Sequence, residues 1–309
     1  MPRRVVVVCG PTATGKTKLA VALAHRLQGE VVSADSMQVY KNMPVGTAVP
    51  TLEEREGIPH HLMECVFPAH SFSVAQYQAM AEEAFADIHA RGKTVILCGG
   101  TGLYIDAVMF SRDFPPVDPT GRIRAEMEAL MLERGTLYLH NQLVKMDSVA
   151  AEAIHPRNTR RVIRALEVIR LTNRPFSSFV TEPYSMPRYP SALWMGLDME
   201  REKLYDRINQ RVEAMLEKGW LEEAKALFGV VPANATAMQG LGYKELVQFL
   251  EGNRTLAETT AIIQMETRRY AKRQLTWFRR NPNILWYDAD DYTIIDKIMQ
   301  KNARTPFSF

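Results

Sequence analysis

The chain has 309 residues, of which 46% are hydrophobic and 24% are charged. These fractions are typical of a globular protein and exclude a disordered chain or a fibre, and the length favours about two domains. Lysine and arginine total 38 against 35 acidic residues, so the net charge of +3 gives no global reason to expect a nucleic-acid partner. Any such partner must be bound by local clusters of charge.

The cysteine content and the lengths of the apolar runs indicate in which cellular compartment the protein is expected. The three cysteines, Cys9, Cys65 and Cys98, are too few and too scattered for a disulfide framework. No apolar stretch approaches the ~20 residues that span a bilayer, and no signal sequence is recognisable. We therefore expect a cytoplasmic protein with no membrane partner, and a monomer because no motif indicates assembly.

Strand and helix patterns alternate in the first third of the chain. A β-branched run at 5–9 predicts a strand that is buried on both faces. Ser73 and Gln76 form a capping-box pattern before a helix that ends near residue 90. The other expected elements are a helix at 16–27 and strands at 31–34 and 94–98. This alternation predicts βαβ units and a mostly parallel sheet.

The alternation stops near residue 114, and residues 119–179 show only helical patterns. Strand-like runs return at 192–197 and 284–287. They are separated by a long helix at 255–278, which Thr255 and Glu258 open with a capping-box pattern. We therefore predict an α/β core formed by residues 1–112 and 191–309. Residues 113–190 should form a helical insertion domain.

A phosphate-binding motif follows the first strand. The pattern G-x-x-x-x-G-K-[ST] is matched by Gly10, Pro11, Thr12, Ala13, Thr14, Gly15, Lys16 and Thr17. Backbone N–H groups of such a loop surround phosphate oxygens, and the following helix adds its positive dipole end. Lys16 should supply a charge and the Thr17 hydroxyl a ligand for Mg²⁺. The core is thus predicted to be P-loop NTPase-like.

NTP-hydrolysing motors and switches with a phosphate loop hold Mg²⁺ with an aspartate at the end of a second apolar strand, and this chain has no acid there. The strand at 94–98 ends in Gly99, Gly100 and Thr101, with no acid. Asp35 instead follows the second strand, and parallel strands bring their carboxyl ends to one edge. Asp35 should therefore face the phosphate loop and could accept a proton. The alternative is that Asp35 only caps a helix or a turn.

Several motifs in order along residues 5–280 resemble the tRNA dimethylallyltransferase family, also called tRNA isopentenyltransferase. Only the phosphate loop is distinctive by itself, whereas the ordered set is highly specific. The matching segments are 10–17, 33–40, 46–48, 59–62, 99–104, 158–167, 207–211, 240–245 and 267–277.

The resemblance implies transfer of a dimethylallyl group from dimethylallyl diphosphate to an adenosine exocyclic amine. This adenosine lies 3′ of the anticodon in tRNAs that read codons beginning with U. The phosphate loop would then hold a diphosphate leaving group, and the ATP-binding label that the motif invites would describe the fold. The implied partners are the anticodon stem-loop and dimethylallyl diphosphate, with Mg²⁺ as the cofactor.

The resemblance also assigns three catalytic residues. Asp35 would accept the proton of the amine, Thr101 would lie near adenine and diphosphate, and Arg211 would stabilise the diphosphate charge. Without the resemblance, Arg211 would be read as a solvated charge on a helix and Thr101 as part of a tight turn.

The target adenine must be flipped out of the anticodon loop to reach such a site. The Gln38 amide could read an adenine edge. One basic cluster, at 157–164, places arginines at helical spacing, and a second, at 268–280, interleaves cations with aromatic residues. Either cluster is suited to RNA or to a solvated helix face. His60 and His61 have no catalytic assignment; packing or loop anchoring is favoured. By resemblance, the tRNA-binding residues are Asp35, Ser36, Met37, Gln38, Thr159, Arg160, Arg161, Val162, Ile163, Gly240, Leu241, Gly242, Tyr243, Lys244 and Glu245.

Two other functions share these features. A P-loop kinase acting on a small molecule would also need Mg²⁺ and an acidic residue beside the acceptor. An RNA-binding protein that is controlled by a nucleotide would use the phosphate loop without chemistry.

Overall fold

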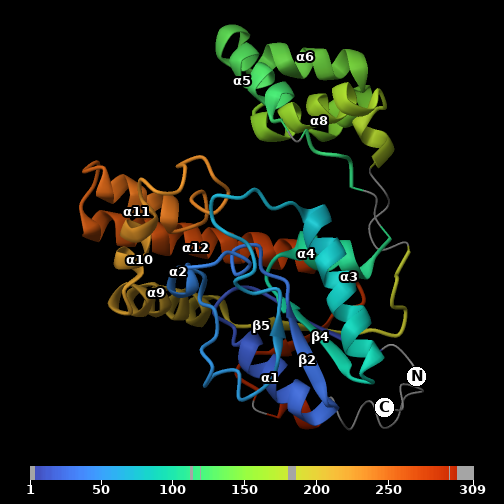
Figure 1. Ribbon diagram of the computed structural model, residues 1–309, viewed down its shortest axis with the longest axis vertical. Helices are drawn as coiled ribbons and strands as arrows, with labels where there is room; N and C mark the ends of the chain where they lie inside the picture. The colour runs from blue at the N-terminus through green and yellow to red at the C-terminus, as the bar shows by residue number, and fades with distance from the viewer. Residues whose placement is uncertain (1–3, 112–113, 119, 180–185, 292, 298–309) are drawn as a thin grey trace. The chain divides into compact units, whose positions relative to one another are not determined.

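The computed structural model describes residues 4–111, 114–118, 120–179, 186–291 and 293–297. The chain divides into two compact units, the first formed by Met1–Phe110 with Pro187–Phe309 and the second by Ser111–Met186. The first unit contains the sheet and the second is helical (Figure 1). In the described parts of the chain, no helix is long and apolar enough to cross a membrane.

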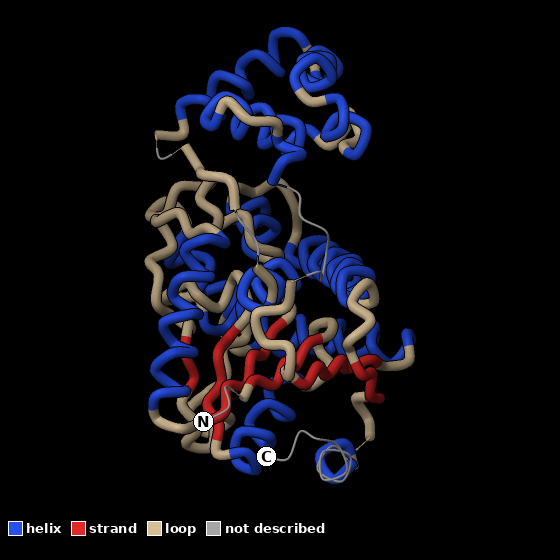
Figure 2. The backbone as a smooth tube through the Cα atoms, turned by 90° about the vertical axis from the view of Figure 1, so that its right-hand side faces the viewer, coloured by secondary structure: helices blue, strands red, loops and turns tan. Residues whose placement is uncertain are grey.

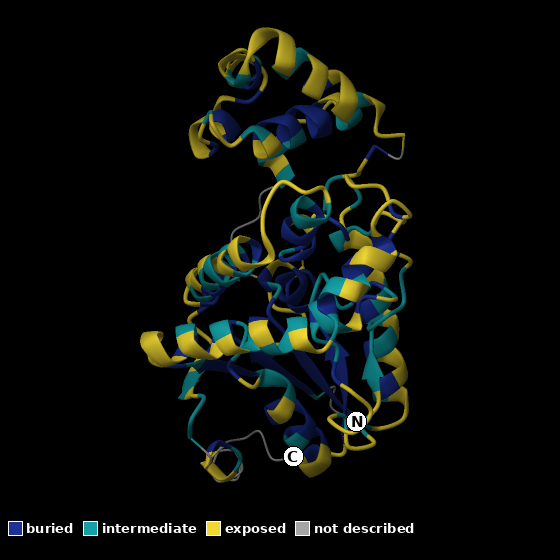
Figure 3. Ribbon diagram, turned by 90° about the vertical axis from the view of Figure 1, so that its left-hand side faces the viewer, coloured by how far each residue is buried: buried dark blue, intermediate teal, exposed yellow. Residues whose placement is uncertain are grey.

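The first unit is built on a six-stranded sheet with the order β3-β2-β4-β1-β5-β6. Every neighbouring pair is parallel, which confirms the predicted α/β class. The central strands are buried on both faces, as the continuous valine run at 5–9 predicts (Figure 3). The strands are β1 (Val5–Cys9), β2 (Gly29–Ser33), β3 (His60–His61), β4 (Thr94–Gly99), β5 (Leu193–Asp198) and β6 (Leu285–Asp288).

Helices lie on both faces of this sheet (Figure 2). Capping boxes at Ser73 and Thr255 open two of them, as their sequence patterns predict. The helices of this unit are α1 (Lys16–Leu27), α2 (Pro44–Thr47), α3 (Val74–Ala90), α4 (Gly102–Met109), α9 (Arg201–Glu217), α10 (Trp220–Leu227), α11 (Tyr243–Leu250) and α12 (Leu256–Phe278).

Helix α1 is anchored by one apolar face. Leu19, Leu23 and Leu27 recur at helical spacing and pack against Val8 and Ile96 of the sheet. Burying each leucine contributes roughly 2 kcal/mol. The phosphate loop that precedes α1 is therefore attached to a fixed strand at one end and a fixed helix at the other.

The short edge strand β3 was not expected from the sequence, because two residues show no period. It carries His60 and His61, and the His61 Nε2 lies 2.7 Å from Glu30 Oε2. Hydrogen bonds from Arg91, Lys93 and His61 lower the pKa of Glu30 to about 2, against the effect of its burial. The contacts of His61 thus anchor the edge of the sheet.

In the second unit, the described elements are all helical. They are α5 (Arg122–Arg134), α6 (Thr136–Met146), α7 (Ser148–Ala153), α8 (Thr159–Thr172) and the 3₁₀ helix η1 (Phe176–Phe179). Leu139 and Leu143 of α6 pack against Val162 and Leu166 of α8, so the unit has a core of its own.

The ends of this unit differ slightly from the predicted insertion at 113–190. Residues 187–190 belong to the first unit, because Pro187 bridges to Phe110 and the Arg188 N–H donates to the Met109 carbonyl at 2.9 Å. A pattern of helices alone could not locate these backbone bonds. Residues 112–113 and 180–185, near the predicted boundaries, lie outside the described residues.

Candidate active site

Three loops meet at one edge of the sheet, as the parallel strands require. They are the phosphate loop after β1, residues 34–36 after β2, and residues 99–101 around the end of β4. The Ala34 N–H donates to the Cys98 carbonyl at 2.8 Å, and the Thr101 N–H donates to the Ala34 carbonyl at 3.0 Å. These bonds hold the loop that carries Asp35 beside the loop that carries Thr101.

The phosphate loop has the backbone that its glycines predict. Gly10 has φ +138°, and a Cβ there would lie 2.5 Å from the Leu197 carbonyl oxygen. Gly15 has φ +79° and immediately precedes α1, whose first N–H groups are free for a ligand. The Thr14 hydroxyl donates to the Pro11 carbonyl at 2.9 Å and closes the turn from inside. The loop is shaped for anions.

Two desolvated cations accompany this loop. Burial lowers the pKa of Lys16 to about 8, an effect that Cys98 opposes and the Arg211 charge reinforces. The Lys16 Nζ donates to the Pro11 carbonyl at 2.6 Å. Burial also lowers the pKa of Arg211, opposed chiefly by Asp35. Neither cation has a carboxylate within 4 Å among the residues the structure describes, so both remain available to an anionic ligand.

Asp35 interacts electrostatically with both cations and also caps its own turn. Its Oδ1 accepts from the Met37 N–H at 2.9 Å, so the turn-capping alternative is true of one oxygen. The Oδ2 makes no hydrogen bond to any part of the chain that is described. The Thr101 hydroxyl accepts from the Ser36 N–H at 3.0 Å and lies 3.3 Å from the Ser36 hydroxyl. Asp35, Lys16, Thr101 and Arg211 therefore form one site.

The amide of Gln38 is fully used inside the protein. Its Oε1 accepts from the Ser33 hydroxyl at 2.9 Å, and its Nε2 donates to the Thr47 and Ala48 carbonyls at 3.3 and 3.1 Å. These bonds fix the segment between β2 and α2. Reading of an adenine by this amide stays a prediction that requires some of these bonds to be exchanged.

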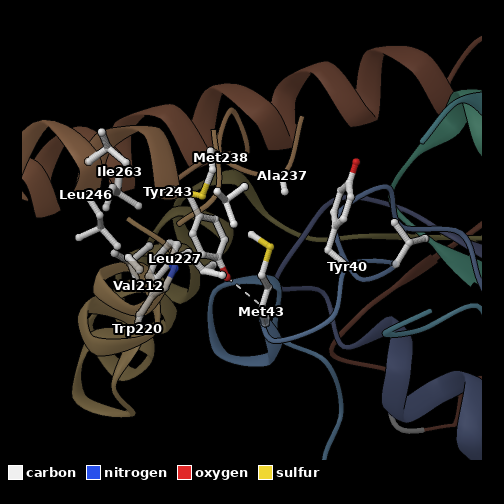
Figure 4. Packing of buried hydrophobic residues seen from close by; sticks show 14 residues of the cluster. Tyr40, Met43, Val212, Trp220, Leu227, Ala237, Met238, Tyr243, Leu246 and Ile263 are labelled. Carbon is white, nitrogen blue, oxygen red and sulfur yellow. Dashed lines mark hydrogen bonds between the residues drawn. The ribbon is translucent and has the colours of Figure 1, made fainter. Parts of the chain in front are cut away.

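The segment from Gly240 to Glu245 lies in an apolar cluster, which Figure 4 shows around Tyr243 and Trp220. A Cβ at Gly240 would lie 2.2 Å from Met37 Cε, and one at Gly242 would lie 2.0 Å from Trp220. Both glycines thus permit close packing. Of the predicted tRNA-binding residues here, Lys244 is exposed, Leu241 is half-buried, and Gly240, Gly242, Tyr243 and Glu245 are buried.

In the predicted tRNA-binding segment 159–163 of the second unit, some side chains are exposed and others are buried. Arg160 and Arg161 are exposed and, within the described ranges, form no ion pair. Thr159 is half-buried at the start of α8. Val162 and Ile163 belong to the core of the unit, so their side chains serve packing. The two free arginines are the available RNA contacts in this run.

Three of the six cations in the second predicted cluster form hydrogen bonds or ion pairs with other side chains. Arg268 donates to Asn209 Oδ1 at 2.5 Å, Arg269 pairs with Glu266 at 2.6 Å, and Arg279 pairs with Asp198 at 2.9 Å. Lys272 is exposed and has no ion-pair partner in the parts of the chain that are described. The alternative, a solvated and internally paired helix face, therefore holds for a large part of this cluster.

One residue at the site was not predicted from the sequence. Gln274 of α12 is buried, and its side chain contacts both Thr12 of the phosphate loop and Gly100. A lone glutamine inside a helix carries no pattern that distinguishes it, and only the packing of α12 against both loops could have identified it.

Comparison with known proteins shows to which family the chain belongs. The family model described as IPP transferase matches residues 38–281. The chain belongs to the IPP transferase family. A tRNA dimethylallyltransferase of Halalkalibacterium halodurans is 46% identical over 300 residues, which are 97% of this chain and 96% of that protein. The resemblance in the sequence motifs is thereby confirmed.

Solved structures of IPP transferases share the fold. The tRNA isopentenylpyrophosphate transferase of Bacillus halodurans has a TM-score of 0.70 at 46% identity, covering 97% of this chain and 95% of that one. A eukaryotic dimethylallyltransferase acting on tRNA has a TM-score of 0.81 at 32% identity, covering 97% of this chain and 77% of that one. As an IPP transferase, this protein is a transferase with a P-loop-like core.

Proposed function

We propose that the protein transfers a dimethylallyl group from dimethylallyl diphosphate to N6 of the adenosine 3′ of the anticodon, in tRNAs reading codons that begin with U. The observation that carries this proposal is that Asp35, with one oxygen free of hydrogen bonds, interacts electrostatically with Lys16 and Arg211, neither of which has an ion-pair partner among the described residues. One site thus combines a proton acceptor with a pair of cations for an anion. Relatives named tRNA dimethylallyltransferase support the choice of substrates.

The anion site suits a diphosphate leaving group. In the reaction, N6 forms a bond to the allylic carbon while the bond from that carbon to the diphosphate oxygen breaks. Negative charge then develops on the diphosphate, and the loop N–H groups, Lys16 and Arg211 stabilise it. Because both cations are desolvated before the ligand binds, their attraction to that charge is weakly screened.

Asp35 is proposed as the acceptor of the proton that N6 releases. An aromatic amine is a weak nucleophile, so proton removal during attack lowers the barrier. The bond from the Met37 N–H fixes the carboxylate through Oδ1 and leaves Oδ2 for the amine. Thr101 would lie beside the reacting groups, held by its hydrogen bond with the Ser36 N–H.

The donors at the phosphate loop fit Mg²⁺ as the cofactor. The Thr17 hydroxyl lies in the first turn of α1 and makes no hydrogen bond within the described residues, so it is available as a ligand. Mg²⁺ binds through few protein oxygens together with substrate phosphates and waters. When bound, the ion would neutralise charge on the diphosphate. Thr17 would hold it.

For the RNA we propose the anticodon stem-loop, with the target adenine flipped out toward Asp35. Residues 35–38 would surround the base, and the exposed Arg160, Arg161 and Lys244 would contact phosphates. We propose that the protein works as a monomer.

The test is a transfer assay without ATP. The protein is incubated with unmodified tRNA, Mg²⁺ and labelled dimethylallyl diphosphate, and label in tRNA is compared with released pyrophosphate. One pyrophosphate per label is expected. ATP-dependent phosphorylation of a small molecule would favour the kinase alternative, and RNA binding without transfer would favour the RNA-binding alternative; either result would overturn the proposal.

A further inference from the structure

A single side-chain amide joins the phosphate loop to the loop that carries Thr101. The Thr12 N–H donates to Gln274 Oε1 at 2.9 Å, and Gln274 Nε2 donates to the Gly100 carbonyl at 2.9 Å. Gln274 is 5% exposed and comes from α12, more than 170 residues away in sequence. The β1–β4 pairing ends at Cys9 and Gly99, and the Gln274 amide links the two loops beyond that point.

The chemistry of this bridge requires an amide. One backbone group is a donor and the other is an acceptor, and a glutamine carries one group of each kind in a fixed geometry. Both backbone groups would be left unpaired in a buried place without it, which is costly. A Cβ at residue 100 would lie 2.2 Å from Gln274 Nε2, so the glycine there allows the amide to reach the carbonyl.

Neighbouring turns of α12 reinforce the same contact. Trp277 Nε1 donates to Asp106 Oδ2 at 3.1 Å, and the indole fills the place that a Cβ at Gly102 would occupy. Tyr270 lies one turn before Gln274, and its burial raises its pKa to about 12 against side-chain hydrogen bonds from Thr101 and Gln274. One face of α12 therefore packs along the loop at Gly100 and the first turns of α4.

We propose that Gln274 is a positioning residue for prenyl transfer, because its amide holds the phosphate loop and the Thr101 loop in one register. This inference rests on the proposed function. The phosphate loop sets the position of the allylic carbon through the diphosphate, and the Thr101 loop borders the position of the acceptor amine. The Gln274 amide acts through these two loops, because its hydrogen bonds go to the Thr12 N–H and the Gly100 carbonyl.

A change of register should slow the chemical step more than it weakens binding. Lys16 and Arg211 form no hydrogen bond with Gln274 among the described residues and would still attract the diphosphate. The distance and angle between the reacting atoms would vary, however, and a displacement of about 1 Å can cost ~10²-fold in rate. The expected signature is a lower kcat at nearly unchanged KM.

The test compares two variants with a matched control. Gln274→Met keeps the volume and removes both hydrogen bonds, whereas Gln274→Asn keeps the amide but is one methylene too short to span the two groups. Gln264→Met is the control, because Gln264 is on the same helix and its amide bonds only to Asn209 and Glu213 on α9 among the described residues. We expect kcat to fall about 10²-fold in both Gln274 variants, with each KM within about 3-fold and the control unchanged.

A second measurement does not depend on the reaction. Hydrogen exchange of the Thr12 amide should be at least about 10-fold faster in Gln274→Met than in the parent, because the N–H no longer has an acceptor. Unchanged exchange, or wild-type kcat in Gln274→Asn, would overturn the bridge. If Thr12 exchange is faster in Gln274→Met than in the parent but the parent transfers no label to tRNA, the proposed function is overturned and the bridge still holds.

Discussion

Lys16 is half-buried beside the phosphate loop, and burial of its ammonium group lowers its pKa to about 8. The lowered value makes the anion site sensitive to pH in a range that ordinary lysines do not reach. Below about pH 8 the free protein presents two cations to a diphosphate; above it, Arg211 alone remains charged.

The affinity for pyrophosphate should therefore fall as pH rises from about 8 to about 9. The protonated amine binds the anion, so each pH unit above the pKa of the free protein should raise Kd up to ~10-fold. Isothermal titration calorimetry at fixed ionic strength measures this slope. Lys16→Met is the control, because it lacks the titrating group and retains any pH dependence of pyrophosphate itself. Equal slopes in parent and variant would contradict the assignment.

The Oδ1 of Asp35 accepts a hydrogen bond from the Met37 N–H, and its Oδ2 remains available in the site. Asp35→Asn keeps an acceptor for the Met37 N–H and removes the basic oxygen, so we expect turnover to fall about 10²–10⁴-fold while tRNA binding survives. Single-turnover transfer and a filter-binding assay measure the two quantities. Asp206→Asn, at an exposed position on α9, should leave both unchanged. Turnover within about 3-fold of the parent would exclude Asp35 as the base.

Among the elements, α2 shows how remote segments support the site. Glu223 of α10 accepts from the Val45 and Gly46 N–H groups, each at 2.8 Å, and from the Tyr243 hydroxyl at 2.6 Å. The Thr47 and Ala48 carbonyls that follow accept from Gln38. A charge at the start of α2 thus helps to fix the segment that leads away from Asp35.

Removing the Tyr243 hydroxyl should loosen this support. Tyr243→Phe takes away a hydrogen bond to a carboxylate and should lower the free energy of unfolding by about 1.5–3 kcal/mol. Urea denaturation measures the change. Tyr138→Phe on α6 is the control, because Tyr138 is 37% exposed and should cost under about 0.5 kcal/mol. A decrease in stability no larger than in the control would show that Glu223 holds α2 without Tyr243.

Local patterns predicted the strands and helices that carry the site, because periodicity and capping act over a few residues. The run at 5–9, the boxes at Ser73 and Thr255 and the parallel sheet are confirmed. The two-residue strand β3 was missed because it is too short for any period. Gln274 was missed, and the internal use of the Gln38 amide was not foreseen, since both depend on backbone groups that the fold brings from distant segments.

At the scale of the molecule, the net charge of +3 conceals a division between paired and free cations. Arg164 lies close to Arg161 in sequence, yet its guanidinium pairs with buried Glu167 at 3.2 Å and donates to the Pro115 carbonyl at 2.9 Å. Arg160 and Arg161 have no such partner within the described ranges. A tRNA would encounter the free cations, and the total charge does not report them.

Arg160 and Arg161 should therefore contribute to the salt dependence of tRNA binding. Replacing both by alanine should reduce the slope of log K against log salt concentration by about 1 for each phosphate that the variant no longer neutralises, with pyrophosphate affinity unchanged. Binding isotherms between about 50 and about 300 mM salt, the range over which such contacts weaken, give the slope. Arg122→Ala is the matched control, because Arg122 is exposed on α5 of the same unit but pairs with Glu126 at 3.0 Å. An equal slope in the double variant and in the control would show that neither arginine contacts RNA phosphate.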